Sequence, residues 1–328
     1  MKFDLNRPAR GGSAFGGKKI TVIGGGTGTY NLLLGLKQYD VSLSAIVTTA
    51  DSGGSSGQLR DEFGVLPPGD LRRCLIALSE NRGDIWRKIF DYRFAGEREK
   101  NNMGNLIITA LTKITGDFPT AIEVAAELLE VKGQVVPATL DDVHLNAELE
   151  NGQVIYGETN IDIPKHNPEL KIKRVFLEPK AFAYKKAIAS IMDSDLVVIG
   201  PGDLYTSIIP NLLVEGLVAA LKATNAKVIY VCNVMTKYGE TNNFSASDFI
   251  KELQRYSNQA IDHVIVNTTK PSSELSESYA KENSFFVMPD VRGKPQHVTK
   301  ADLISSSVLF RHDCKKLAKV IMEIHPVK

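Results

Sequence analysis

The chain has 328 residues, 43% hydrophobic and 23% charged, which is ordinary for a soluble globular protein with a substantial core. Its formal net charge of +1 gives no support for an electrostatic partner such as a nucleic acid or a membrane surface. No stretch approaches the roughly 20 apolar residues of a membrane span, and residues 1–17 form a polar, glycine-rich tail that we expect to be flexible. We therefore expect a cytoplasmic protein with no membrane span and no nucleic-acid partner.

The three cysteines, Cys74, Cys232 and Cys314, are far apart in the sequence and lack metal-ligand spacing. We therefore expect neither a disulfide framework nor a zinc site. The first two lie in apolar surroundings, which is typical of small core residues.

The first third of the chain alternates between strand and helix patterns. Residues 18–24 predict a buried strand that ends in glycine, 29–37 a helix and 41–50 a second strand. A strand, a crossover helix and a strand form a βαβ unit, whose sheet is parallel. Residues 51–69 are rich in Gly, Ser and Pro and predict a long, functional loop. Helices are then expected over 70–79, 84–92, 105–115 and 119–131.

Short apolar runs separated by turn residues replace this pattern over residues 133–180. The Asn151-Gly152 pair is a strong hairpin signal, so we interpret 133–180 as an antiparallel insertion. Its strands are expected over 134–140, 143–149, 153–156 and 172–177.

Strand and helix patterns alternate again in the last part of the chain. Strands are expected over 196–200, 227–232 and 263–267, and helices over 212–221, 247–256 and 313–324. The whole pattern predicts one Rossmann-like domain over 18–328, a three-layer α/β/α sandwich with a mostly parallel sheet.

The first candidate site is the glycine-rich segment 24–28, which joins the first strand to the first helix. Glycines let the backbone approach a phosphate closely, and the amides at the start of the helix then face the anion. The match to the dinucleotide fingerprint is incomplete, because Thr29 stands where a third glycine is expected. The alternative is that the glycines only tighten a turn.

The second candidate is the segment 51–57, which follows the second strand at the carboxyl edge of the sheet, where open α/β sheets bind ligands. Asp51 stands where a ribose-binding carboxylate is expected, and it is equally a candidate Mg²⁺ ligand. The alternative is a flexible loop in which Asp51 caps a helix. Asp70 is expected to cap the next helix. Three arginines could pair with phosphate oxygens, although each taken alone is more often a solvated surface residue: Arg60, Arg72 and Arg73.

Two further loops follow predicted strands at the same edge. Residues 200–207 form another glycine turn, so a two-sided nucleotide cleft is expected, although a plain structural turn is the alternative. Residues 233–241 offer polar groups to a base or a sugar, and the alternative is an ordinary polar loop. No zinc-protease, Walker or nucleophile-elbow motif is present, and His312 by itself is more typical of a structural residue.

Seven segments occur in a fixed order: GGGTG, ADSGGSSGQLRDEFG, LPPGDLRRCLIAL, MGNLIITALTKITGDF, IGPGDLYTSIIPNLL, CNVMTKYGET and RHD. Together they resemble the YvcK (GlmR) group, also called the gluconeogenesis factor family, within the CofD-like superfamily. The resemblance runs from about Lys18 to the C-terminus.

The resemblance implies a bacterial cytoplasmic protein that binds UDP-sugars such as UDP-N-acetylglucosamine (UDP-GlcNAc) and links carbon supply to cell-wall precursor synthesis and cell shape. An enzyme of amino-sugar synthesis and a second copy of the chain are the protein partners to consider. Tyr279 and Arg311 lie in segments similar to those that contact the nucleotide sugar in the group. The predicted ligand-binding residues are Gly24, Gly25, Gly26, Thr27, Gly28, Asp51, Ser52, Gly53, Gly54, Ser55, Ser56, Arg60, Gly69, Asp70, Arg72, Asn105, Gly200, Pro201, Gly202, Leu204, Tyr205, Ser207, Asn233, Thr236, Glu240, Tyr279 and Arg311.

Two residues depart from the pattern of the group. Asn101 stands where relatives often have His, and Cys314 follows Arg-His-Asp where relatives often have Thr. No catalytic residue stands out, so we expect a ligand-binding regulator rather than an enzyme. The alternatives are a CofD-like, Mg²⁺-dependent transferase of a phospholactyl-type group and an NAD(P)-dependent oxidoreductase, and NAD is also a candidate ligand without chemistry.

Overall fold

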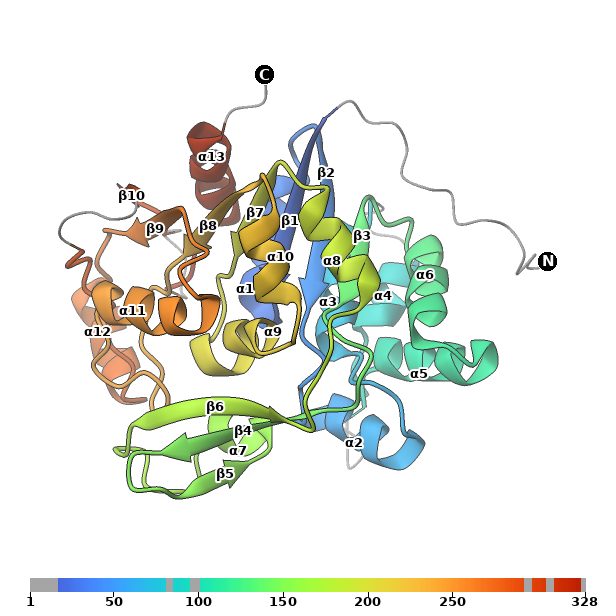
Figure 1. Cartoon of the computed structure of the whole chain (residues 1–328), viewed down its shortest axis with the longest axis horizontal. Helices are drawn as coiled ribbons and strands as arrows, with labels where there is room; N and C mark the ends of the chain where they lie inside the picture. Colours follow the sequence, from blue (N-terminus) through green and yellow to red (C-terminus); the bar gives the residue numbers. More distant parts are fainter. Residues whose placement is uncertain (1–16, 81–84, 95–100, 292–296, 305–309, 326–328) are drawn as a thin grey trace.

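The protein, as a computed structural model, is described over residues 17–80, 85–94, 101–291, 297–304 and 310–325. A seven-stranded sheet forms its centre, in the order β10-β9-β8-β7-β1-β2-β3, and every neighbouring pair is parallel (Figure 1). Its strands are β1 Lys18–Gly24, β2 Val41–Val47, β3 Gln134–Pro137, β7 Leu196–Ile199, β8 Lys227–Val231, β9 His263–Asn267 and β10 His297–Ala301. The predicted α/β fold with a mostly parallel sheet is thus confirmed.

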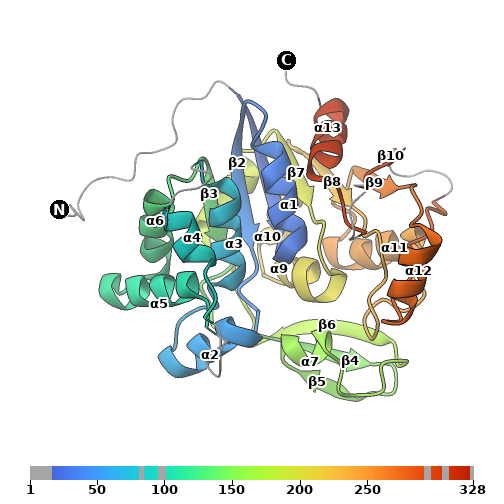
Figure 2. The ribbon, with the colours of Figure 1, turned by 180° about the vertical axis from the view of Figure 1, so that it is seen from behind.

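Helices cover both faces of this sheet, because successive residues of a strand point to opposite sides. In β7, Val197 packs into one apolar cluster and Val198 into the other. Helices α1, α3, α4, α5, α6 and α13 cover one face (Figure 2), and α8, α9, α10 and α11 cover the other (Figure 1). Their bounds are α1 Gly26–Leu36, α3 Gly69–Leu78, α4 Ile85–Asp91, α5 Met103–Thr115, α6 Phe118–Leu128, α8 Lys185–Met192, α9 Ile209–Leu212, α10 Leu217–Ala223, α11 Ala246–Ser257 and α13 Cys314–Ile324.

A small antiparallel sheet lies beyond the carboxyl ends of the central strands (Figure 1). It has the order β5-β4-β6, with β4 His144–Leu149, β5 Val154–Tyr156 and β6 Ile172–Glu178. The Asn151-Gly152 hairpin joins β4 to β5 as predicted, and Gly152 adopts a φ of 85°. A short helix, α7 Glu158–Asp162, follows β5.

The predicted start of the antiparallel insertion is wrong. Strand β3, at 134–137, pairs in parallel with β2, so the antiparallel part begins only at β4. The short run and its glycine were typical of the insertion in sequence, and only the pairing with Ser44–Val47 assigns it to the main sheet. The predicted flexible tail lies in residues 1–16, outside the described residues.

Four other elements differ from the predictions. The first helix starts at Gly26, inside the glycine segment, and the predicted loop 51–69 contains the helix α2, Gly54–Phe63. The helix expected over 212–221 is interrupted: α9 ends at Leu212 and α10 begins at Leu217, after Gly216 at a φ of 104°, and a π-helix, η1 Leu204–Ile208, precedes α9. Strand β10 was not predicted. Tyr279 lies in helix α12, Ser273–Ala280.

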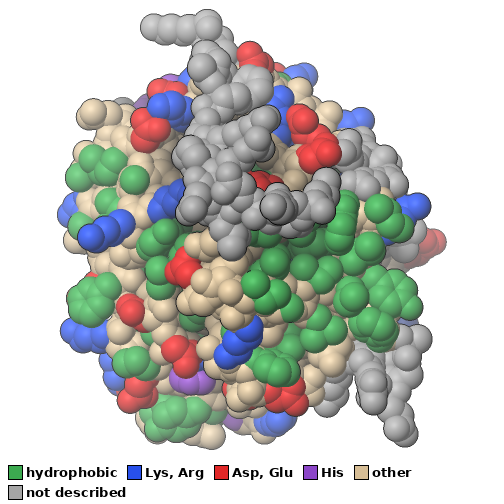
Figure 3. Space-filling model, turned by 90° about the vertical axis from the view of Figure 1, so that its right-hand side faces the viewer, with side chains coloured by type: hydrophobic (Ala, Val, Ile, Leu, Met, Phe, Trp, Pro, Cys, Tyr) green, Lys and Arg blue, Asp and Glu red, His purple; other side chains and the backbone are tan. Residues whose placement is uncertain are grey.

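Apolar side chains gather on the surface near α5 and α6 (Figure 3), where Ile114 of α5 is 77% exposed. Exposed apolar patches often mark interaction sites. The expected homo-oligomer stays a prediction. In the described part of the chain, no helix has the length and apolar character to cross a bilayer.

Candidate functional site

The two glycine turns that follow β1 and β7 touch each other at the carboxyl edge of the sheet. A Cβ atom on Gly28 would lie 2.2 Å from the Pro201 carbonyl oxygen, and one on Gly24 would lie 3.9 Å from the Gly200 Cα. Gly28 therefore has no room for a side chain. Helix α1 begins at Gly26 without a side-chain cap, so its first amides face this edge.

Asp70 makes a contact that sequence analysis did not predict. It does not cap α3, which begins at Gly69 after Pro68 with no side-chain cap. Instead its Oδ2 accepts a 2.7 Å hydrogen bond from the Gly26 amide. Burial raises the pKa of Asp70 to about 6, and the nearby charge of Asp51 adds to the rise. The Asp70 carboxylate therefore already accepts the hydrogen bond of the amide that was expected to bind an anionic ligand.

The loop after β2 joins the glycine turns to the small sheet. Asp51 Oδ1 accepts a 2.8 Å bond from the amide of Gly53, and burial raises the Asp51 pKa. Ser52 Oγ lies 3.0 Å from Thr159 Oγ1, and its amide donates to Glu158 Oε2 at 3.4 Å. Helix α7 is thereby fastened to this loop.

Glu158 is a site residue that the sequence did not reveal. Burial raises its pKa to about 8, and the charges of Asp51 and Asp162 raise it further. No motif surrounds it, and only the folding of the small sheet over the carboxyl edge brings it next to Asp51. It joins Asp51 and Asp70 in an acidic group with few neighbouring cations. Arg73 is one of them: its charge lowers the pKa of both aspartates, and its Nη1 donates to Thr27 Oγ1 at 3.3 Å.

A second acidic group gathers residues from α7 and from the loops after β7 and β8. Asp162, Asp203 and Glu240 have carboxylate oxygens within 4.8 Å of one another, a spacing that could hold a metal ion. The Lys237 ammonium binds all three, at 2.9 Å from Asp203 Oδ2 and 3.0 Å from Glu240 Oε1 and in close contact with Asp162. An ammonium therefore stands where a metal ion would. Burial raises the pKa of Glu240 to about 7, although Lys237 opposes the shift.

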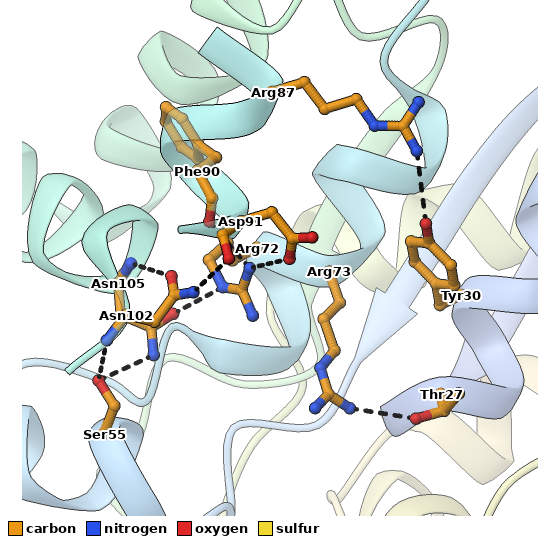
Figure 4. Close-up of polar contacts among 10 residues, drawn as sticks. All are labelled: Thr27, Tyr30, Ser55, Arg72, Arg73, Arg87, Phe90, Asp91, Asn102 and Asn105. Carbon is orange, nitrogen blue, oxygen red and sulfur yellow. Dashed lines mark hydrogen bonds and ion pairs between the residues drawn. The ribbon is translucent and has the colours of Figure 1, made fainter. Parts of the chain in front are cut away.

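Several predicted ligand residues are engaged inside the protein. Arg72 is 3% exposed and donates to Asn105 Oδ1 at 3.0 Å, to the Phe90 carbonyl at 2.9 Å and to Asp91 at 3.3 Å (Figure 4). Asn105 Nδ2 also donates to Ser55 Oγ at 3.2 Å. These groups support the loop after β2, and Arg72 Nε and Nη1 and Asn105 Nδ2 all donate to groups of the protein.

Arg60 and Tyr205 likewise have internal partners. The buried Arg60 donates to the Val143 carbonyl at 2.8 Å and pairs with Asp142, which ties α2 to the start of the small sheet. The hydroxyl of Tyr205 donates to Glu252 of α11 at 3.1 Å. Leu204 is buried beside it.

Among the other predicted residues, some lie against the glycine turns, and others are bonded to other segments or are exposed. Asn233 and Ser207 lie against the glycine turns, because Asn233 Nδ2 donates to the Gly202 carbonyl at 2.8 Å and Ser207 Oγ would lie 3.5 Å from a Cβ on Gly26. Asn233 Oδ1 is buried without a partner among the described residues. By contrast, Thr236 and Tyr279 accept hydrogen bonds from the backbone of Phe285 and Phe310, and Arg311 is exposed.

Asp51 and Asp70 offer carboxylate oxygens of the kind that a divalent cation prefers, and the charge of Asp51 acts on Asp70. Asp51 Oδ2 would lie 3.5 Å from a Cβ on Gly69 at the start of α3, and Asp70 Oδ2 2.6 Å from one on Gly25 in the first glycine turn. Mg²⁺ prefers such oxygens and would neutralise the charges that raise their pKa values. Ser56 also hydrogen-bonds Asp51, which helps to orient it.

Comparison with known proteins defines the class. Residues 20–307 match the family described as 2-phospho-L-lactate transferase CofD, so the chain belongs to the CofD family. Within it, the chain is a member of the gluconeogenesis factor group, as the sequence motifs predicted. The gluconeogenesis factor of Halalkalibacterium halodurans is 39% identical, over 94% of this chain and 97% of its own, and that of Listeria innocua is 44% identical, over 94% and 96%. The crystal structure of a UPF0052 family protein from Bacillus halodurans superposes with a TM-score of 0.88 at 38% identity, covering 93% of this chain and 98% of its own.

Proposed function

We propose that this protein binds a nucleotide sugar of the UDP-GlcNAc type at the carboxyl edge of its sheet. It acts there as a regulator that links carbon metabolism to cell-wall precursor synthesis and cell shape, through an enzyme of amino-sugar synthesis. The contact between Gly28 and Pro201 carries the proposal, because it brings two amide-rich turns side by side, an arrangement that suits a diphosphate. Arg73, beside Thr27, supplies a cation for the diphosphate, and the free Oδ1 of Asn233 is available to a sugar or a base.

The Asp70 carboxylate makes this binding dependent on pH. A diphosphate at the Gly26 amide must displace Asp70 or accept a hydrogen bond from its protonated form. The pKa of Asp70 is about 6, so its charge repels the ligand above that pH and is lost below it. We therefore expect UDP-GlcNAc to bind more tightly at pH 5.5 than at pH 8. The variant Asp70→Asn should bind with little dependence on pH over this range.

Calorimetry with UDP-GlcNAc, UDP and free N-acetylglucosamine tests the proposal. UDP-GlcNAc should bind without turnover, and Arg73→Gln should weaken binding by about tenfold, the loss of one charge-assisted hydrogen bond to phosphate. Arg174→Gln is the matched control, because Arg174 is an exposed arginine that pairs with Glu148 on the small sheet. Absence of heat with every UDP-sugar would contradict the proposal.

The acidic group supports a second candidate, a Mg²⁺-dependent transfer of a phospholactyl-type group. The charge of Asp51 raises the pKa of Asp70, and the charge of Asp162 raises the pKa of Asp51, as neighbouring carboxylates do. Mg²⁺ held there would neutralise a diphosphate during transfer. Asp51 and Asp70 would hold the ion, and Arg73 would orient the donor. Mg²⁺-dependent turnover of a nucleotide-activated phospholactate, lost in Asp51→Asn, would favour this candidate over the regulator.

A further inference from the structure

A pocket of 640 Å³ opens between the C-terminal part of α1, α4 and the start of α13. Leu34 of α1 and Cys314 of α13 contribute to its walls, and α4 contributes Arg87, Lys88 and Asp91. Its size lies in the usual range for small-molecule sites, about 300–1,000 Å³. None of the residues predicted to bind the nucleotide lines it.

Among the described residues that line this pocket, positive side chains outnumber negative ones. Arg87, Lys88 and Lys315 supply three cations, and the one carboxylate of that described lining, Asp91, already pairs with the buried Arg72 at 3.3 Å. Arg87 Nη2 donates to the Tyr30 hydroxyl at 3.4 Å, which holds its guanidinium toward α1 (Figure 4). The pocket therefore favours an anion, whereas the edge beside the glycine turns is rich in carboxylates.

The charge of Lys315 does not stabilise α13. It stands in the first turn of α13, and cations near a helix N-terminus are disfavoured by the helix dipole. The Asp313 carboxylate accepts the amide hydrogen bonds of Lys315 and Lys316, so the helix start is already capped. The Lys316 ammonium has a partner, Asp302, at 2.6 Å. Lys315, in contrast, lines the pocket.

We propose that this pocket binds a small phosphorylated metabolite. A guanidinium and two ammonium groups match the oxygens of a phosphate monoester, and the arginine offers it paired donors. The volume is larger than a phosphate ion needs, and Leu34 and Cys314 line the remaining space, where a carbon skeleton fits. This site is separate from the nucleotide site, so its ligand is an additional signal for the protein.

Cys314 provides a reporter inside the pocket. It is the one partly exposed cysteine, because Cys74 and Cys232 are buried. We would measure the rate at which the neutral reagent N-ethylmaleimide alkylates the full chain, with glucose 6-phosphate as the probe and glucose as its uncharged match. Glucose 6-phosphate should slow the modification of Cys314 at least fivefold at saturation, and glucose should leave the rate unchanged. Equal rates with the two sugars would overturn the proposal.

Charge variants locate the phosphate. The double variant Lys88→Gln/Lys315→Gln should weaken protection by glucose 6-phosphate at least tenfold. Lys319→Gln, an exposed lysine of the same helix outside the pocket, should leave protection unchanged. Full protection in the double variant would also overturn the proposal. Calorimetry with UDP-GlcNAc on the same protein measures binding at the nucleotide site. The two proposals can therefore be contradicted separately.

Discussion

The two candidate sites use charged side chains in opposite ways. Around the loops at the carboxyl edge, charges are buried and paired: Arg72 is 3% exposed with three partners, and Lys237 is held by three carboxylates. In the pocket between α1, α4 and α13, Lys88 and Lys315 are exposed. A buried, paired charge fixes the position of loops, whereas an exposed one remains available for a ligand. Removing a buried, paired charge such as that of Arg72 should therefore change mainly stability, whereas removing an exposed charge of the pocket should change mainly binding.

The largest expected effect is the loss of the Arg72 network. Arg72→Ala leaves Asn105 and the Phe90 carbonyl without their partner and opens a cavity, and breaking such a buried network costs about 3–5 kcal/mol. Urea unfolding should show this loss. Arg73→Ala, one residue along the same helix, should cost less than about 1 kcal/mol, because Arg73 is partly exposed and solvent screens its charge. Similar losses for the two would remove the distinction between structural and ligand-binding arginines.

Asp70→Asn should stabilise the protein increasingly as the pH rises above 4, with the full gain above pH 6. The folded-state pKa of Asp70 is about 6 against an ordinary value of 3.8, so the native state holds its proton more tightly. Stability due to this group is therefore present at pH 4 and falls as the pH rises to 6. The uncharged amide side chain of the variant avoids the cost of burying the ionised carboxylate. That cost is at most about 3 kcal/mol, and solvent screening of the half-buried side chain lowers it. The oxygen of the amide side chain can still accept from Gly26.

Thermal unfolding at pH 4 and pH 8 tests whether Asp70→Asn stabilises the protein at the higher pH. The difference in melting temperature between the variant and the parent should be near zero at pH 4 and positive at pH 8. Asp193→Asn, in an exposed ion pair with Lys19, is the control and should show no such gain. Destabilisation at pH 8 would mean that the Asp70 charge supports the turn instead of straining it.

Lys237→Met should cost less, about 2 kcal/mol at pH 8, because the Lys237 side chain is 28% exposed and its pairs are partly screened. The three carboxylates then repel one another. The loss should be smaller at pH 6, since Glu240, with a pKa of about 7, is then largely protonated. Millimolar Ca²⁺ should raise the melting temperature of the variant and leave the parent unchanged, because the ammonium no longer fills the cluster. No response to Ca²⁺ would show that the carboxylates move apart.

The sequence predicted the turns better than the side chains around them. Glycines at 24–28 and 200–202 mark backbone bends, and a bend is set by local chemistry that a sequence displays. The roles of Arg72 and Asp70 depend on what folds against them: Asn105 lies 33 residues away from the first, and Gly26 44 residues away from the second. Adjacent residues such as Arg72 and Arg73 look alike in sequence, and burial alone separates them.

The same reason explains why β3 and Glu158 were missed. Strand β3 has the composition of the insertion that follows it, and its partner β2 lies about 90 residues earlier. Glu158 reaches the site only because the small sheet folds over the carboxyl edge, where its oxygen meets the Ser52 amide 106 residues away. Long-range pairing of this kind leaves no local pattern.

The smallest expected effect, that of Lys315→Gln, tests most directly whether the charges of the pocket are free of structural roles. Lys315→Gln removes a cation from the first turn of α13, where the helix dipole disfavours it, so the protein should become more stable by a few tenths of a kcal/mol. Lys316→Gln, at the next position, should instead destabilise it slightly, because it loses the ion pair with Asp302. Denaturant midpoints of the two variants, measured side by side, should move in opposite directions. A clear loss of stability in Lys315→Gln would give that lysine a structural role and place it with the paired charges of the other site.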